Sequence, residues 1–208
     1  MDWVPVSAAL LLTGALALGL GGFLLPESEG AGESLRIVQE HGSQWMVAAA
    51  VLFIASVCLT LGLPAALTLV QRRGWRLGLV AAIVLEVGFI GTAGFAMLMA
   101  FFRALVETGT IKTAGLDDVA SDAGLAIFLD TWIVGLYLGE LLLALALLRA
   151  RTTPRWVPLA LVAHAVTLPL SNLLPSYLSK ATVLLLVVGF AGVAIQAAAV
   201  PQARRRVS

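Results

Sequence analysis

Short polar segments divide the chain into six long apolar runs, each close to the length of a membrane-spanning helix. A helix crosses the hydrocarbon core of a bilayer with about 20 apolar residues. The runs cover residues 3–25, 45–70, 77–102, 125–148, 156–174 and 181–200. The fifth run is the weakest, because His164, Pro169, Ser171 and Asn172 interrupt it. The pattern predicts an all-α, polytopic transmembrane helical bundle of six spans in a single integral membrane domain.

The composition supports a lipid environment. Of the 208 residues, 60% are hydrophobic and 12% are charged, whereas a soluble domain is about 45–50% apolar and about 25% charged. A core of this size cannot hide the surplus of apolar residues, so we expect the lipid bilayer, and no nucleic acid, as the main partner. The single cysteine, Cys58, excludes a disulfide within the chain and a cysteine metal cluster.

The charged residues between the runs are segregated by sign, and this predicts the orientation. Arginines without neighbouring acids occupy the turns at 71–76 and 149–156 and the tail at 201–208. Acidic residues dominate the predicted outer loops, 26–44 and 103–124, the first of which includes a predicted surface helix within 32–45. Because Lys and Arg concentrate on the cytoplasmic side, both termini are predicted to be cytoplasmic. The excess of arginine over lysine is typical of a bacterial sequence, so we expect the bacterial inner membrane.

Three ionisable residues, Glu86, Glu140 and His164, lie at one predicted depth, each nine or ten residues from the nearest cytoplasmic arginine. That spacing corresponds to about 14–15 Å along a helix, close to the midplane of a core about 30 Å thick. Paired carboxyl groups and an imidazole can exchange protons near neutral pH. They predict a midplane site that handles a small molecule, an ion or a proton. A structural pairing that fixes helix packing is the alternative.

Helical spacing adds further residues to this candidate site. Tyr137 shares a helix side with Glu140, and Thr167 and Ser171 follow His164 at intervals of three and seven residues. Asp130 lies ten residues farther out than Glu140, at the level where the third run ends at Arg103. We therefore predict an outer ion pair between Asp130 and Arg103.

No catalytic residue, metal site or cofactor is predicted. A catalytic zinc site needs about three protein ligands, and the two histidines, His41 and His164, lie at different levels. Neither a GxSxG motif nor a phosphate-binding loop occurs. These absences favour a protein that is not an enzyme. Besides transport or proton-linked sensing, a non-catalytic membrane subunit or scaffold that binds partner helices or lipids is the second hypothesis, and a small bundle of this kind is expected to form a homo-oligomer or bind a partner subunit.

Three segments carry a resemblance to other proteins. They are LGLPAALTLVQRRGWRLGLV at 61–80, LLRARTTPRWVPLAL at 147–161 and GESLRIVQEHGSQW at 32–45. Together they resemble a loose group of small polytopic bacterial membrane proteins of unknown function. The resemblance implies a multi-pass helical bundle and carries no substrate with it.

Overall fold

The computed structural model describes residues 3–26, 31–70, 73–110, 119, 121–170 and 180–205. Within these ranges the chain forms six α-helices and no strand. The helices are α1 (Val4–Leu24), α2 (Ala31–Leu67), α3 (Trp75–Glu107), α5 (Ala123–Ala150), α6 (Trp156–Leu170) and α8 (Val183–Arg205). The prediction of an all-helical fold is confirmed.

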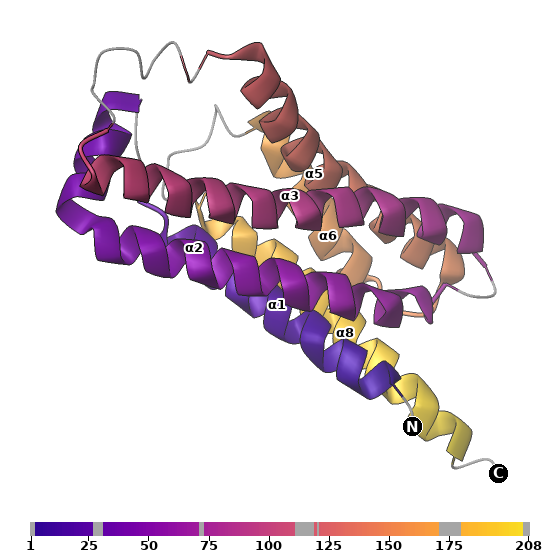
Figure 1. Cartoon of the computed structure of the whole chain (residues 1–208). Helices are drawn as coiled ribbons and strands as arrows, with labels where there is room; N and C mark the ends of the chain where they lie inside the picture. The colour runs from indigo at the N-terminus through magenta and orange to yellow at the C-terminus, as the bar shows by residue number, and fades with distance from the viewer. Residues whose placement is uncertain are drawn as a thin grey trace.

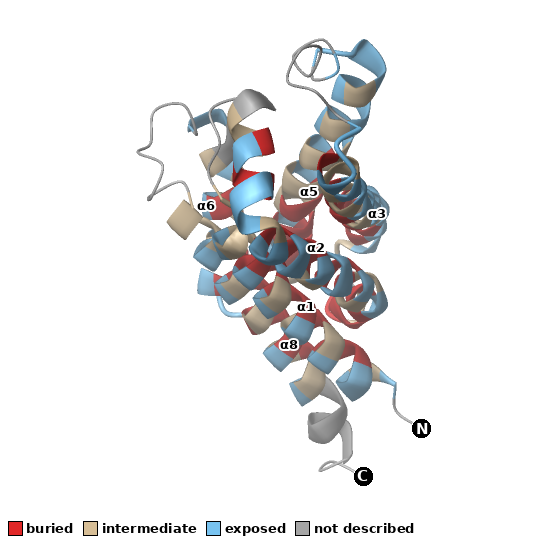
Figure 2. Cartoon of the chain, turned by 60° about the vertical axis from the view of Figure 1, so that its left-hand side comes forward, coloured by how far each residue is buried: buried red, intermediate tan, exposed pale blue. Residues whose placement is uncertain are grey.

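Four helices, α1, α2, α3 and α5, are long and apolar enough to cross a membrane, and shorter apolar helices cover Trp156–Thr167 and Val183–Ala199. The helices pack as a bundle in which α2 lies between α1 and α3, α5 follows α3, and α6 and α8 complete the far side (Figure 1). Buried residues face the interior of the bundle (Figure 2). Its outer faces expose large apolar side chains such as Leu16, Ile83 and Phe128, which is compatible with a membrane protein.

Two helices extend beyond the apolar runs into the segments predicted as outer loops. Helix α2 begins at Ala31 rather than near 45, and α3 continues to Glu107 rather than ending near 102. At His41 the backbone leaves the helical conformation, with φ −128° and ψ 33°. Figure 1 shows the part of α2 before this break turned away from the longer part. The helix predicted within 32–45 is therefore present, joined to α2.

The first part of α2 is helical although it is polar, because local ion pairs and burial support it. Arg36 lies 3.6 Å from Glu33 and 3.9 Å from Glu40, at helical spacings of three and four residues, and such pairs each stabilise a helix by about 0.2–0.5 kcal/mol. Leu35 and Val38 are buried in the core. The segment is therefore a helix without being part of an apolar run.

Glycines let α3 and α5 approach closely. A Cβ atom added at Gly88 would lie 2.7 Å from the backbone nitrogen of Leu136, and one added at Gly139 would lie 2.7 Å from that of Leu85. Small residues at helix contacts allow this approach in membrane bundles. The close packing fixes the position of α5, which carries one half of the candidate site.

Gly88→Ala should lower the free energy of unfolding by about 1–3 kcal/mol, because a methyl group forced against backbone atoms overpacks the contact. Gly94 is the matched control on the same helix, since a Cβ atom there would meet nothing within 4 Å. Gly94→Ala should be neutral or stabilising, because alanine favours a helix over glycine by about 1 kcal/mol. Thermal unfolding of both variants in one detergent checks this, and equal stabilities would contradict the packing described.

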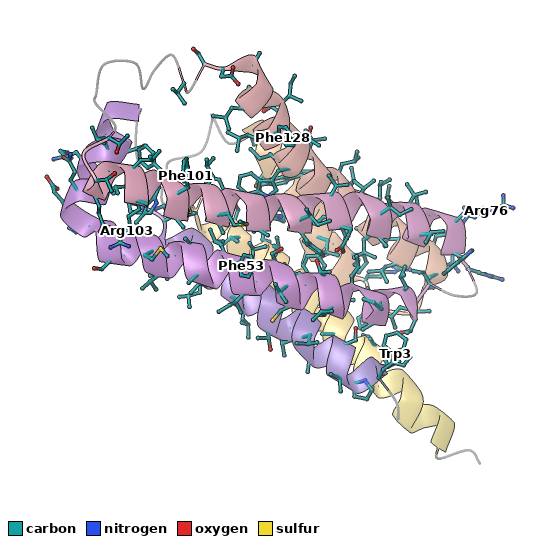
Figure 3. The ribbon with its side chains drawn as sticks, viewed as in Figure 1. Trp3, Phe53, Arg76, Phe101, Arg103 and Phe128 are labelled. Carbon is teal, nitrogen blue, oxygen red and sulfur yellow. The ribbon has the colours of Figure 1, made fainter. Side chains whose placement is uncertain are left out.

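Both termini lie at one end of the bundle, beside the arginine-bearing turns (Figure 1). Figure 3 shows Arg76 and Trp3 toward this end and Arg103 at the opposite end. Arg76, at the start of α3, and Arg149, at the end of α5, line one surface hollow together with Trp75. The fold therefore brings separate arginine clusters to the same end as the termini.

Candidate functional site

Helices α5 and α6 bring Glu140 and His164 into direct contact. His164 Nδ1 lies 2.6 Å from Glu140 Oε2, and the two side chains are 4% and 0% exposed. Each residue is nine positions from an arginine near the α5–α6 turn, Arg149 in the last turn of α5 or Arg155 just before α6. Because the two helices run in opposite directions from this turn, equal spacing places the two side chains at one level. The predicted association of Glu140 with His164 is present in the structure.

The second oxygen of Glu140 has an unusual environment. Glu140 Oε1 is buried and has no hydrogen-bond partner among the described residues. An isolated charge in such an environment is costly, whereas a neutral pair is tolerated. A neutral pair forms when a protonated carboxyl donates to Nδ1, or when a carboxylate accepts from an imidazolium. In both arrangements Nε2 of His164 carries a hydrogen. A third neutral arrangement, in which Nδ1–H donates to a protonated carboxyl, would place the acid hydroxyl on Oε1, and a buried hydroxyl without a partner is costly.

Tyr137 and Thr167, both predicted as site residues, support the imidazole. The Tyr137 ring stacks on the His164 ring, with centroids 4.9 Å apart and planes at 13°. The Thr167 hydroxyl donates to the His164 carbonyl oxygen at 2.6 Å, and a side-chain hydrogen bond also joins Thr167 to Tyr137. These contacts hold the imidazole in one orientation. Ser171, the remaining predicted member, lies outside the described residues.

A cavity of about 200 Å³ lies beside the pair, and His164 and Tyr137 are part of its wall. The other described residues of the wall are mostly apolar: Leu18, Gly22, Leu25, Leu52, Phe95, Trp132, Leu136, Lys180, Thr182, Val183 and Leu186. Lys180 Nζ donates to the Leu25 carbonyl oxygen at 3.0 Å, which ties the residue before α8 to the end of α1. The imidazole is therefore in contact with a small space rather than fully enclosed by protein.

Phe95 and Trp132 form a second stacked pair in the cavity wall, with centroids 4.6 Å apart and planes at 23°. Trp132 Nε1 donates to Thr92 Oγ1 at 2.9 Å, so the polar edge of this indole is already engaged. Neither ring was predicted as a site residue. No signal in the sequence distinguished Trp132, because it follows Asp130 by two residues and so lies near the predicted outer interface, where tryptophan is enriched.

Glu86, the third predicted midplane residue, is half-buried and stands apart from the pair. Among the described residues no hydrogen bond or ion pair joins it to Glu140 or His164. Gly88 faces α5, and Glu86, two residues earlier, points about 160° away at 3.6 residues per turn. It lies beside the exposed Ile83 and Ile90. Glu86 was predicted at the depth of Glu140 and His164, but its side chain points away from them.

The predicted ion pair between Asp130 and Arg103 is not formed within the described residues. Arg103 instead pairs with Glu107, one turn later on α3, at 2.5 Å, and Asp130 is exposed. The beginning of α5 diverges from the end of α3 (Figure 1), which separates the two side chains. The prediction assumed parallel helices at this end and is corrected.

The described residues contain no group of three or more His, Cys, Asp or Glu side chains that could hold a metal ion. Comparison with known protein families, curated proteins and solved structures finds no match to the chain. The functional argument therefore rests on the geometry of the pair and its cavity.

Proposed function

We propose that the chain is a six-span protein of the bacterial inner membrane in which Glu140 and His164 form a protonatable binding site for a small molecule or ion. Its role would be transport or proton-linked sensing. The observation that carries the proposal is the buried hydrogen bond between Glu140 and His164, with one carboxyl oxygen unpartnered and the imidazole in a cavity wall. Ionisable residues at membrane depth usually mark such sites.

The proposed orientation places the termini in the cytoplasm, with α6 and α8 as the two shorter spans. The described arginines Arg73, Arg76, Arg149, Arg151 and Arg155 are exposed, and the turns that carry them lie at the end where the termini lie. A cytoplasmic concentration of arginine is the usual determinant of orientation. This assignment puts the opposite end, with Arg103 and Glu107, outside the cell.

In this orientation the cavity leads from the outside toward the pair. Its wall includes Leu25, at the end of α1, and Lys180, before α8, and both lie at the end opposite the termini. Loss of one proton would change the neutral pair to a net charge of −1 in a region of low dielectric constant, where charge interactions are strong. Tyr137 and Lys180 are the other titratable groups among the described residues of the cavity wall. Binding of a ligand and release of a proton would therefore be coupled.

Gly22→Leu should block access to His164, because Gly22 lines the cavity and a Cβ atom there would have its nearest neighbour, Val183 Cγ2, at 4.0 Å. In a His41→Gln background His164 is the sole histidine, so its reaction with diethyl pyrocarbonate can be measured alone. We expect the rate to fall by about tenfold, equivalent to about 1.4 kcal/mol in the barrier. Gly94→Leu, at a position with open space on α3, is the control. Equal rates in both variants would exclude this cavity as the route.

Glu86 favours a second candidate function, that of a membrane subunit or scaffold. It is half-buried at the edge of an apolar exposed face and makes no hydrogen bond or ion pair among the described residues. Polar side chains hydrogen-bond between helices in lipid, so a partner helix would account for this carboxyl group.

Glu86→Leu should then reduce energy transfer between differently labelled copies of the protein in vesicles, while the thermal stability of each copy is kept. Ile83→Leu, one turn away on the same face, is the control and should leave the transfer unchanged. If Glu86→Leu also leaves the transfer unchanged, self-association through Glu86 is excluded.

A further inference from the structure

The size of the cavity limits its occupant to a single-ring compound. An engineered apolar cavity of about 150 Å³ binds benzene, and drug-sized ligands occupy about 300–1,000 Å³. The cavity beside His164 measures about 200 Å³. It therefore suits a ring that carries one or two small substituents.

The walls favour a flat ring over an aliphatic chain. Two stacked pairs contribute to them, Phe95 with Trp132 and Tyr137 with His164. Aromatic rings associate by offset stacking or edge-to-face contact, and four rings around one small space offer both geometries. A planar ligand would gain more contact here than a branched aliphatic molecule of equal volume.

Among the aromatic side chains of the wall, one hydrogen-bond donor remains for the ligand, and the two other polar residues described in the wall, Lys180 and Thr182, have partners of their own. The Trp132 N–H already donates to Thr92, and a side-chain hydrogen bond engages Tyr137 with Thr167. His164 Nδ1 is occupied by Glu140. In the neutral pair Nε2 carries a hydrogen and therefore acts as a donor, which requires an acceptor oxygen on the ligand.

We propose that the cavity binds a single-ring aromatic or quinonoid carbonyl compound whose carbonyl oxygen accepts a hydrogen bond from His164 Nε2. This inference rests on the proposed function, because it takes the Glu140–His164 pair to be a ligand site. Binding requires no covalent or redox step. The ring of the ligand lies among the four aromatic side chains, and its carbonyl oxygen is the feature that defines the ligand class.

Acetophenone and cumene form a pair of probes, because both carry one benzene ring with a three-atom substituent of similar size and only acetophenone has a carbonyl oxygen. Both affinities are measured by calorimetry on the full chain in one detergent. The variant for comparison is Glu140→Leu combined with His164→Phe, which removes the donor and keeps a ring at position 164. We expect the ratio of acetophenone to cumene affinity to fall about fivefold to tenfold in the variant, the usual contribution of one hydrogen bond. Partition into detergent cancels in this comparison.

A second readout covers the case in which the double variant does not fold. In the His41→Gln protein labelled with ¹⁵N-histidine, acetophenone should shift the Nε2 signal of His164 and cumene should not. An unchanged affinity ratio, or an Nε2 signal that acetophenone leaves in place, would overturn the ring-carbonyl assignment. The protonatable site would still stand if the His164 nitrogens respond to pH, so the two failures are distinguishable.

Two kinds of compound carry a ring with a carbonyl oxygen: a quinone dissolved in the membrane and a water-soluble aromatic ketone. Competition against acetophenone separates them. Displacement by a quinone with an isoprenoid tail, supplied in vesicles, supports the membrane source. Displacement by the tail-less ring without displacement by the tailed compound supports the water-soluble source. Failure of both to compete overturns the assignment.

Discussion

Replacing His164 alone with phenylalanine should lower the free energy of unfolding by about 3–5 kcal/mol, because removal of one partner from a buried pair leaves the other without compensation. Glu140 is fully buried, and its only hydrogen-bond partner among the described residues is His164. Phenylalanine preserves the ring that stacks on Tyr137, so the loss can be assigned to the carboxyl group. Equilibrium unfolding in a single detergent measures the effect.

The double variant Glu140→Leu/His164→Phe should recover most of this loss. Apolar residues of similar volume often replace a buried ion pair without cost or with a gain of about 1–4 kcal/mol. Recovery of stability together with loss of pH-dependent ligand binding would support the protonatable site. Recovery of stability with ligand binding retained would support a structural pairing. A single variant as stable as the native protein would contradict the buried contact between Glu140 and His164.

Cysteines placed after α3 and after α5 should react from opposite sides of the membrane. Thr110, after α3, and Thr152, in the α5–α6 turn, are both exposed, and Cys58→Ser removes the native cysteine. In intact cells a membrane-impermeant maleimide should label Thr110→Cys and leave Thr152→Cys unlabelled, because the arginine-bearing turn is assigned to the cytoplasm.

Permeabilised cells provide the control for this labelling, since both cysteines should then react. Labelling of Thr152→Cys alone in intact cells would invert the proposed orientation. Labelling of both in intact cells would show that α5 does not separate two sides of a membrane. The result is all or none, so it does not depend on the stability of either variant.

The sequence predicted the fold where hydrophobic length determines it and missed the parts that local interactions determine. The apolar runs at 3–25, 77–102 and 125–148 correspond closely to α1, α3 and α5. The helix predicted within 32–45 is present, but the sequence did not predict that it joins α2, which begins at Ala31. The divergence of α5 from α3 at the end near Asp130 (Figure 1) depends on tertiary packing, which spacing along one helix does not report.

The sequence predicted the depth of the candidate site residues but not the direction in which each side chain points from its helix. Counting from the arginines placed Glu140 and His164 at one level, and the structure joins them. The same count included Glu86, which points away from α5. The direction of a side chain in a bundle depends on which neighbours each helix contacts. For α3, the close approach at Gly88 shows which side of the helix faces α5. The aromatic cavity wall depended on contacts between several helices and could not be derived from one of them.

The most direct test of the protonatable site is the ¹⁵N spectrum of His164 in the His41→Gln protein, in vesicles of known orientation. We predict that both ring nitrogens respond to the external pH, through the cavity, and that Glu140→Gln changes the pH at which they respond. A spectrum that is the same at every external pH at which the protein stays folded would contradict the proposal, because the pair would then exchange no proton with the outside.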